Sequence, residues 1–461
     1  MSERLILGVD EGTTAVKAVL FDERLQPVRE ARRGKENRHP QPGWVEQDGE
    51  EVLAAVVDAV AELLDDPPGK VVACGLDHQG ESVLAWDTET GSPLSPIVVW
   101  QDKRSQEVLD RVAGSEDEIK ARSGLPLDPY FSAGKLAWLL EHDESVQRAR
   151  EAGTLRMGTV DSFVCDRLGA GFATDASTAS RTQLHALGTP GFDQTLGEIF
   201  GVPIEVLPEV RDTVGDLGTL RHPDWPVELR LTGQAVDQQA ALAGAGCVVP
   251  GRVKATYGTG VFILANVGDE VPRPAGGLLP TVAWCIDGHT EYAIDGGVFA
   301  AGAMLEWMCR ELGLAPDPAA LGVLAREANG SAGASVLPAL AGIGAPWWRP
   351  DAHAVLAGIH SGTTRANVAR AALEGIAWRV ADVVAAIRES IEVDTLRVDG
   401  GLPTEPLMLA LPAHPIGAPV EAGGADATVA GAAALGAVGA GVLASLAEAA
   451  ELLPVDRRVE A

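Results

Sequence analysis

The N-terminal half of the chain alternates between short apolar runs and longer segments with helical spacing. Five short apolar runs predict β-strands: residues 5–9, 16–21, 71–76, 83–87 and 97–100. Apolar side chains recur three and four positions apart over residues 48–64, which predicts a helix, and residues 133–141 predict another. Strands that alternate with helices in this way are typical of an α/β fold with a mixed or parallel sheet.

The C-terminal half repeats this order. Four runs predict strands: residues 253–256, 261–267, 292–294 and 396–398. Helices are expected at residues 299–312 and 367–387, and the second carries an apolar stripe that includes Val368, Ile376 and Val383. Two α/β halves of similar order indicate a duplicated unit with a boundary near residues 240–250 and a ligand between the halves.

Residues 427–446 contain no charged side chain and could be mistaken for a membrane span. Most of them are Ala and Gly, so their hydrophobic drive is weak, and Glu448 and Glu451 follow closely. The sequence therefore predicts a close-packed buried helix at this place. No signal peptide is expected, because residues 1–4 lead straight into the first strand.

Composition limits the possible partners. A chain of 461 residues is long enough for about two or three domains. Its net charge of -29 argues against nucleic acid or an anionic membrane as a partner, because attraction to phosphate requires positive charge. The five cysteines are widely spaced and form no C-x-x-C pair, which indicates reduced thiols in the cytoplasm.

Each half contains a hairpin whose tip is built from Gly and Thr. The tips are DEGTTAVK at residues 10–17 and TYGTGVF at residues 256–262. Small side chains let backbone N–H groups approach an anionic ligand, so the two tips predict a phosphate clamp. Asp10 could bind a metal ion beside the first tip, and an anionic nucleotide would need one on so acidic a chain. The alternative is that both tips are ordinary hairpin turns.

An aspartate lies near the boundary of the two halves, in GQAVDQQAAL at residues 233–242. If the ligand is a nucleotide, Asp237 is the natural general base for a substrate hydroxyl that attacks the terminal phosphoryl group. The alternative is that Asp237 only caps the Ala-rich helix that follows. Spacing alone leaves both interpretations open.

The residues described above carry a resemblance to a known family. The matching stretches, in order, are DEGTTAVKAVLFD, GWVEQDGEE, VVWQDKRS, SGLPLDPYFSAGKLAWLL, TDASTASRTQLHAL, DQQAALAG, TYGTGVF, LPALAGIGAPWWRPDA, GTTRANVARAALEGIAW and VDGGLPTEPLM. Together they cover almost the whole chain, which resembles the FGGY carbohydrate kinase family and, within it, the glycerol kinases.

This resemblance implies a fold, an activity and two ligands. The fold is α/β, an actin-like ATPase fold with two ribonuclease-H-like domains, residues 1–243 and 244–461, and a nucleotide cleft between them. The activity is ATP-dependent phosphorylation of a primary hydroxyl of a small polyol or sugar, with Mg²⁺. The resemblance also implies a cytoplasmic homodimer.

The family pattern assigns roles by position. Asp237 would be the catalytic base, and Asp10 would hold Mg²⁺ through water. The residues expected at the ATP site are Thr13, Thr14 and Lys17 in the first phosphate loop, Thr259 in the second, and Gly302, Glu306, Gly401 and Glu405 around the adenosine. The residues expected at the substrate are Gly80, Glu81, Trp100, Tyr130, Asp237, Gln238 and Phe262.

Several departures from the family pattern bear on specificity. Gly80 stands where glycerol kinases have a substrate-binding Arg, and loss of a charged partner costs about 1.5 to 3 kcal/mol, which argues against glycerol itself. Lys17 replaces another Arg, so a cation is kept but the bidentate fork is lost. Glu306 replaces Gln and Glu405 replaces Asn, which keeps an acceptor, loses a donor and puts the adenine contacts in question.

The volume vacated at Gly80 predicts a larger substrate, a polyol or ketose of about four or five carbons. A pentulose kinase, for a xylulose-like or ribulose-like substrate, is therefore an alternative. A catalytically silent nucleotide-binding sensor of the same fold is another. The presence of both Asp10 and Asp237 argues against the sensor.

Overall fold

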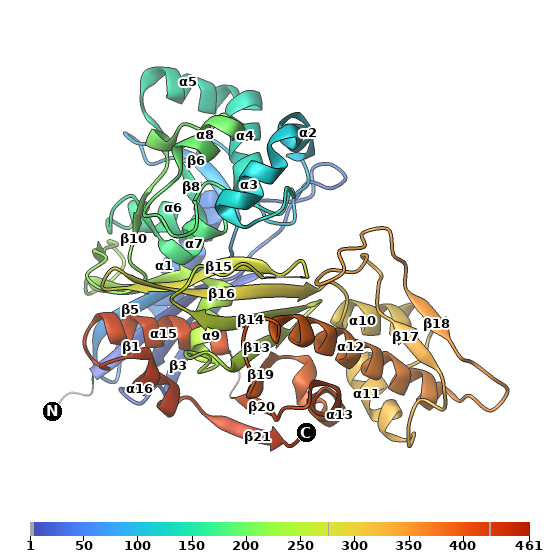
Figure 1. Ribbon diagram of the computed structural model, residues 1–461. Coiled ribbons are helices and arrows are strands. Elements are labelled where there is room, and N and C mark those ends of the chain that lie inside the picture. Colours follow the sequence, from blue (N-terminus) through green and yellow to red (C-terminus); the bar gives the residue numbers. More distant parts are fainter. Residues whose placement is uncertain (1–3, 275, 424–425) are drawn as a thin grey trace. The chain divides into compact units, whose positions relative to one another are not determined.

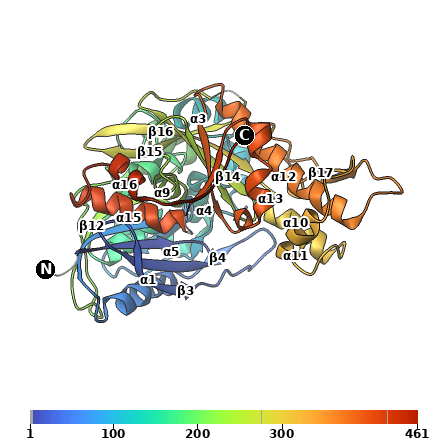
Figure 2. The same cartoon turned by 90° about the horizontal axis from the view of Figure 1, so that it is seen from below.

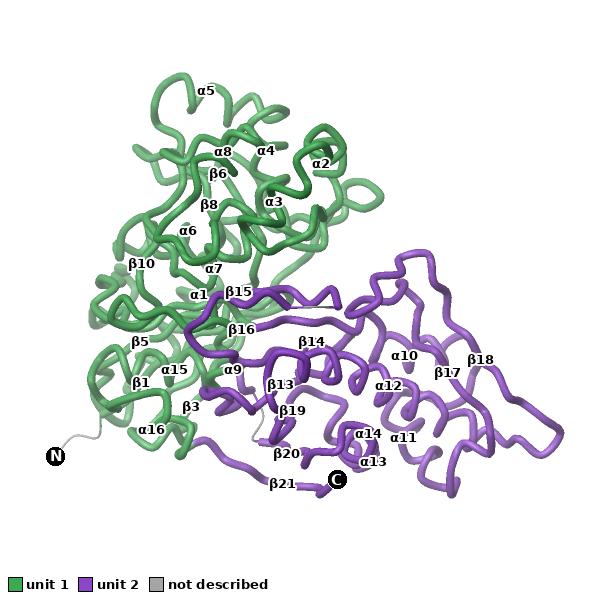
Figure 3. The backbone as a smooth tube through the Cα atoms, in the orientation of Figure 1, with its two compact units in different colours: residues 1–244, 281–292, 428–452 green, residues 245–280, 293–427, 453–461 purple. Residues whose placement is uncertain are grey.

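The computed structural model describes residues 4–274, 276–423 and 426–461, whose helices and strands are labelled in Figures 1 and 2. The chain divides into two units, which Figure 3 colours separately. Unit 1 comprises residues 1–244, 281–292 and 428–452, and unit 2 comprises residues 245–280, 293–427 and 453–461. Each unit therefore contains segments that are distant in the sequence.

Unit 1 is built on a six-stranded sheet in the order β11-β12-β5-β1-β2-β3. Its strands are β1 (Arg4–Glu11), β2 (Ala15–Phe21), β3 (Pro27–Gly34), β5 (Lys70–His78), β11 (Thr219–Leu220) and β12 (Leu229–Val236). β1 and β2 form the predicted antiparallel hairpin, while β1, β5 and β12 are parallel neighbours. The predicted strand at 71–76 is confirmed and is longer than expected.

One face of this sheet is covered by α1 (Gly49–Leu64) and α6 (Val160–Arg167). Leu5, Leu7 and Val9 of β1 pack into the same apolar cluster as the buried side of α1. The predicted helix at 48–64 is confirmed, and Asp48 is its N-cap, because its side chain accepts hydrogen bonds from the N–H groups of Glu50 and Glu51.

The opposite face is covered by α15 (Ala427–Gly439), which Figures 1 and 2 both show beside the sheet. A Cβ at Gly8, Gly75 or Gly233 would lie 2.6, 1.8 or 2.5 Å from a backbone atom of α15. Only glycine at these three strand positions therefore allows so close an approach. The predicted buried helix is confirmed, but it ends at Gly439 and not at residue 446.

A left-handed residue explains the early end of α15. Gly441 has φ +67°, and α16 (Leu446–Leu452) is a separate helix. Among the helices of the described residues, none is both long enough and apolar enough to cross a membrane.

Unit 1 also contains a four-stranded sheet in the order β4-β7-β6-β8. Its strands are β4 (Glu46–Gln47), β6 (Val83–Asp87), β7 (Ile97–Val98) and β8 (Leu155–Thr159). The other elements of unit 1 are α2 (Gln106–Val112), α3 (Glu116–Ser123), α4 (Ser132–His142), α5 (Glu144–Ala152), α7 (Ala176–Ser180), α8 (Gln194–Phe200), α9 (Asp237–Gly244), β9 (Ala173–Asp175), β10 (Glu209–Arg211) and the short 3-10 turns Ala113–Ser115 and Ile204–Val206. The predicted strand at 83–87 and the predicted helix at 133–141 are present, and the strand predicted at 97–100 is shorter than expected.

Unit 2 contains most of a seven-stranded sheet in the order β15-β16-β14-β13-β19-β20-β21, of which residues 281–292 in β15 and β16 are assigned to unit 1. Its strands are β13 (Arg252–Tyr257), β14 (Val261–Gly268), β15 (Leu279–Ile286), β16 (His289–Val298), β19 (Thr395–Gly400), β20 (Val420–Gly423) and β21 (Val455–Val459). The order β20-β19-β13-β14 matches β12-β5-β1-β2 of unit 1, with the same parallel and antiparallel pairs. The predicted repeat of the first half is confirmed in topology.

The longest helix of the described residues is α12 (Arg365–Ile387), which belongs to unit 2. A capping box between Thr364 and Asn367 fixes its start. The other elements are α10 (Gly302–Arg310), α11 (Pro318–Arg326), α13 (Pro406–Ala410), α14 (Ala413–Ile416), the 3-10 turn Leu402–Thr404, and the two-stranded sheet of β17 (Ser335–Leu337) and β18 (Val355–Ala357). The helix predicted at 299–312 is shorter than expected, and β15 was not predicted.

Candidate active site

Three aspartates meet at one edge of the unit 1 sheet. Asp10 near the end of β1 is the register partner of Asp77 near the end of β5. On the other side of β5, Val236 of β12 is the partner of His78, and Asp237 follows as the first residue of α9. The carboxyl ends of neighbouring parallel strands lie at the same edge of a sheet, so distant parts of the chain supply one cluster.

The alternation of side chains in the strands places Asp10 and Asp77 on one face. Side chains two positions apart in a strand share a face, so Asp10 lies on the side of Gly8, and Asp77 lies on the side of Gly75. Both glycines contact α15. The two carboxyl groups therefore lie on the α15 face, away from the apolar cluster under α1.

Burial dominates the electrostatics of this cluster. It raises the pKa of Asp10, and the charges of Asp237 and Glu11 raise it further, against a hydrogen bond to Asp77 that lowers it. Burial also raises the pKa of Asp77 well above its usual value, with the Asp10 carboxylate as the next cause. The two carboxyl groups can therefore share a proton when no cation is nearby.

The first phosphate loop is held by hydrogen bonds to its backbone and to one hydroxyl. Gln47 Nε2 donates to the carbonyl of Thr13 at 2.6 Å, and Trp100 Nε1 donates to Thr13 Oγ1 at 3.0 Å. Thr14 is exposed, and its carbonyl accepts the N–H of Lys35 at 2.9 Å. The structure thus links Trp100, which was expected to be an apolar wall, directly to this loop.

Lys17 lies on β2 as the register partner of Asp10. Its ammonium group forms an ion pair with Glu30 at 3.1 Å. Lys17 is therefore next to Asp10 in the sheet, and its ammonium group is paired with a carboxylate of β3.

A buried charge pair also supports this loop and was not predicted. Lys35 forms an ion pair with Glu11, and the two side chains are 3% and 0% exposed. Gln79 Nε2 donates to Glu11 Oε1 at 3.1 Å and to Gln47 Oε1 at 2.9 Å. Burial raises the pKa of Glu11, and the Lys35 charge opposes that effect. These four side chains form one buried network below the first phosphate loop.

The residues expected at the substrate form a second group in unit 1. Glu81 has φ +59°, a left-handed backbone that is strained for a residue with a Cβ. Glu81 Oε1 accepts a hydrogen bond from Arg181 Nε at 2.7 Å, and both side chains are buried. The Arg181 guanidinium lies 5.9 Å from the centre of the Tyr130 ring, which contacts Trp100 edge to face at 5.6 Å. Glu81, Tyr130 and Trp100 are thus connected, and Arg181 is a member that was not predicted.

A buried lysine lies beside this group. Lys135 Nζ donates to the carbonyls of Tyr130 at 2.5 Å and Phe131 at 3.0 Å. Burial lowers the pKa of Lys135 to about 7, and the Glu81 carboxylate opposes that effect. Lys135 therefore fixes the backbone that presents Tyr130.

The space beside Gly80 is different from the expectation. A Cβ built at Gly80 would lie 2.6 Å from Val236 Cγ2. The position that the first atom of a side chain would occupy is therefore already filled by Val236, so the vacated volume predicted for a larger substrate is not open at that point.

In unit 2 the second Gly-Thr tip meets the start of α10 and the end of β19. The Thr259 carbonyl accepts the N–H groups of Ala301 at 2.9 Å and Ala303 at 3.1 Å. A Cβ at Gly302 would lie 2.6 Å from the Gly258 carbonyl oxygen, so only glycine fits there. Gly401 N donates to Tyr257 O at 3.1 Å. Thr259, Gly302 and Gly401 are thus brought together within one unit.

The other three predicted residues of unit 2 have individual positions. Phe262 lies on β14 opposite Thr256. Glu306 is exposed on α10. Glu405 caps α13 by accepting the N–H of Leu407 at 3.2 Å and forms an ion pair with Arg326. The capping bond and the ion pair already engage both carboxylate oxygens of Glu405, a role that the sequence did not suggest.

The carboxylates of unit 1 fit a magnesium ion. No group of three or more His, Cys, Asp or Glu side chains within the described ranges could hold a metal ion by itself. Mg²⁺ in nucleotide sites usually takes one or two carboxylates and completes its shell with phosphate oxygens and water. Neither oxygen of the buried Asp77 carboxyl accepts a hydrogen bond from an N–H or O–H group of the described residues, which suits the neighbourhood of a cation.

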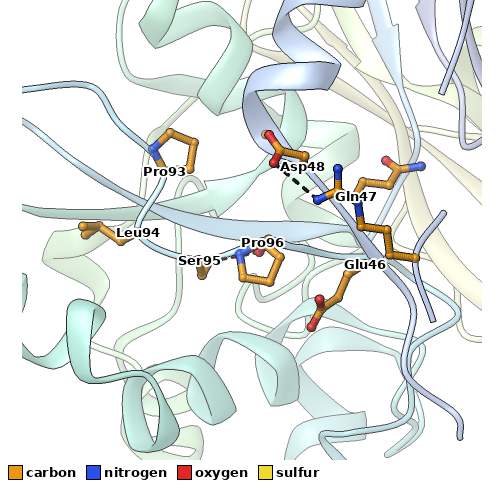
Figure 4. A pocket seen from close by; sticks show the side chains of 9 residues that line it. Glu46, Gln47, Asp48, Pro93, Leu94, Ser95 and Pro96 are labelled. Atoms are coloured by element: carbon orange, nitrogen blue, oxygen red, sulfur yellow. Dashed lines mark hydrogen bonds and ion pairs between the residues drawn. The ribbon is translucent and has the colours of Figure 1, made fainter. Parts of the chain in front are cut away.

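A surface hollow in unit 1, about 370 Å³ in volume, adjoins the buried network through Gln47, which lines it (Figure 4). Its lining includes Arg38, Glu46 and Asp48 but none of the residues predicted for substrate, ATP or metal. Arg38 Nη1 lies 3.5 Å from Asp48 Oδ2, and Glu46 is paired with Arg104 at 2.8 Å. The charged side chains of this hollow are therefore engaged in ion pairs with each other or with Arg104.

Solved structures with the same fold include kinases of two substrate classes. The crystal structure of Plasmodium falciparum glycerol kinase with ADP matches with a TM-score of 0.93 and 28% identity, over 99% of this chain and 94% of that chain. A ligand-bound xylulose kinase from Lactobacillus acidophilus matches with a TM-score of 0.88 and 21% identity, over 99% and 94%, and shows the fold alone. The predicted actin-like ATPase fold is confirmed.

Sequence comparison gives the family. The glycerol kinase of Citrifermentans bemidjiense is 39% identical over 99% of this chain and 94% of that protein. The models of the FGGY family of carbohydrate kinases match residues 5–244 with the N-terminal domain and residues 253–440 with the C-terminal domain. The predicted enzyme class, a kinase that uses ATP and a small-molecule substrate, follows from these matches. The chain belongs to the FGGY family of carbohydrate kinases.

Proposed function

We propose that this kinase transfers the terminal phosphoryl group of ATP to a primary hydroxyl of a small polyol or sugar, with Asp237 as general base. The observation that carries the proposal is the cluster of Asp10, Asp77 and Asp237 at adjoining strand ends. Asp237 removes the hydroxyl proton while that oxygen forms a bond to the γ-phosphorus. The bond between the γ-phosphorus and the bridging oxygen breaks, and ADP leaves.

Each unit supplies part of the ATP site in this proposal. In unit 1, Thr13, Thr14 and Lys17 contact phosphate oxygens, and Asp10 holds Mg²⁺. The bound ion neutralises charge on the phosphate oxygens. In unit 2, Thr259 contacts phosphate, and Gly302 and Gly401 bind the adenosine through their backbone. Glu306 is exposed, and Glu405 is paired with Arg326. We therefore expect the backbone contacts of Gly302 and Gly401 to determine nucleotide preference.

The substrate is bound by unit 1 groups, with Phe262 of unit 2 as an apolar contact. Glu81 and Gln238 bind hydroxyl groups, and Trp100 and Tyr130 cover the carbon skeleton. The strained backbone of Glu81 supports a functional role, because such strain persists mainly where the surrounding structure requires it. The glycerol kinase relatives favour glycerol, whereas the missing guanidinium at Gly80 favours a different polyol or ketose, with pentuloses as the second candidate.

A substrate panel tests this choice. We expect a polyol or ketose of four or five carbons to reach at least the kcat/KM of glycerol, because the enzyme lacks the guanidinium at position 80 that would favour glycerol by about tenfold or more. ADP formation with ATP and Mg²⁺ would be measured for glycerol, erythritol, xylulose and ribulose. If glycerol gave the highest kcat/KM, the specificity argument from Gly80 would fail.

We also infer a cytoplasmic homodimer from the family. The buried thiols of all five cysteines support a reducing compartment. Unit 2 exposes large apolar side chains that an interface could cover, among them Trp347, Ile359 and Trp378 at 60, 57 and 59% exposure. Sedimentation should give twice the chain mass of 47.9 kDa, and a mass of one chain at micromolar concentration would contradict the inference.

A further inference from the structure

Asp77 differs from the other buried acids of unit 1. Glu11 has Lys35, Glu81 has Arg181, and Asp161 accepts hydrogen bonds from Thr174 Oγ1 and Gln234 Nε2, both at 2.7 Å. Asp77 is 0% exposed, and neither of its oxygens accepts a bond from an N–H or O–H donor of the described residues. A buried carboxyl without donors is costly, so its retention calls for a function.

The direction of the Asp77 side chain indicates what that function is. Register pairing and strand alternation place the Asp77 carboxyl on the same face as Asp10, its direct neighbour. The Asp10 carboxyl is within hydrogen-bonding reach of it, and no N–H or O–H donor of the described residues contacts its oxygens. Two carboxyl groups that face each other with only a shared proton between them are an arrangement in which a divalent cation can replace that proton.

We propose that Asp77 is a second carboxylate of the divalent cation site of Asp10, where it coordinates the cation or accepts hydrogen bonds from its water ligands. This rests on the proposed function of Asp10. Two carboxylates supply twice the negative charge that Asp10 alone supplies. The site therefore binds Mg²⁺ or Mn²⁺ even before a nucleotide adds its phosphates. With Asp77, unit 1 therefore binds the cation by itself and does not depend on ATP to bring it.

The test measures cation binding directly, without turnover. Mn²⁺ would be titrated into the full-length protein without nucleotide and again with ADP, and free Mn²⁺ would be followed by electron paramagnetic resonance. We expect Asp77→Asn to raise the Kd for Mn²⁺ by about tenfold or more, since the amide keeps the shape and removes the charge. Asp161→Asn is the matched control, a buried aspartate outside the cluster, and should stay within about twofold of the wild type.

A parallel Asp10→Asn variant separates this inference from the proposed function. Loss of Mn²⁺ binding in both Asp10→Asn and Asp77→Asn supports the shared site. If Asp10→Asn lost the ion and Asp77→Asn kept the wild-type Kd, Asp77 would have no part in the site, although the role of Asp10 would stand. If both kept it, the metal role of Asp10 and the inference would fall together. Asp77→Ser, with circular dichroism as a check of folding, repeats the test should the amide fold poorly.

Discussion

Asp237→Asn should lower kcat by about a hundred- to ten-thousandfold, the range that a positioned general base contributes. The amide keeps the size of the side chain but does not accept the hydroxyl proton. ADP affinity should stay within about twofold, because the adenosine-binding residues proposed here, Gly302 and Gly401, belong to unit 2. Steady-state rates from a coupled ADP assay and calorimetry with ADP would measure the two effects.

The outcome distinguishes a base from a helix cap. Asp237 begins α9, and its Oδ1 accepts the N–H of Gln238 at 2.7 Å, so a structural role alone would show as a lower unfolding temperature with normal turnover. Asp216→Asn, a change at an exposed aspartate of the same unit, is the control and should leave both quantities unchanged. Wild-type turnover in Asp237→Asn would remove Asp237 from its proposed role.

The second large effect is expected on stability. Arg181→Ala should lower the free energy of unfolding by about 3 to 5 kcal/mol, because it leaves the Glu81 carboxylate buried without its partner. Burial already raises the pKa of Glu81, and Arg181 is the first group that opposes this. Urea unfolding followed by tryptophan fluorescence would measure the change.

A second substitution checks the cause of that loss. Glu81→Gln in the Arg181→Ala background removes the unpaired charge, so the double variant should regain part of the lost stability. If the double variant were as unstable as Arg181→Ala alone, the loss would come from packing of Arg181 against Tyr130 and Phe131 and not from the ion pair.

The parts of the fold that local pattern determines were predictable. The two hairpins, the helix after Asp48 and the long helix α12 follow from apolar spacing and capping residues close in sequence. The end of α15 was missed, because Ala and Gly continue unchanged through a left-handed turn at Gly441. β15 at residues 279–286 was also not predicted.

The candidate site was only partly predictable, for a physical reason. Arg181 reaches Glu81 across 100 positions of the chain, and Asp77 meets Asp10 only through strand register. Gln47 and Lys35 support the first phosphate loop from other elements. No spacing in the sequence encodes such contacts. The filled space at Gly80 depends on Val236, which likewise belongs to a distant strand.

The glycine contacts of α15 have a consequence for the order in which the protein folds during synthesis. Gly8, Gly75 and Gly233 lie in the first half of the sequence, but the helix that covers them begins at Ala427. One face of the six-stranded sheet of unit 1 therefore stays uncovered until nearly the whole polypeptide has left the ribosome. A fragment that stops near residue 244 would carry that bare side permanently, which makes the N-terminal half a poor candidate for independent expression.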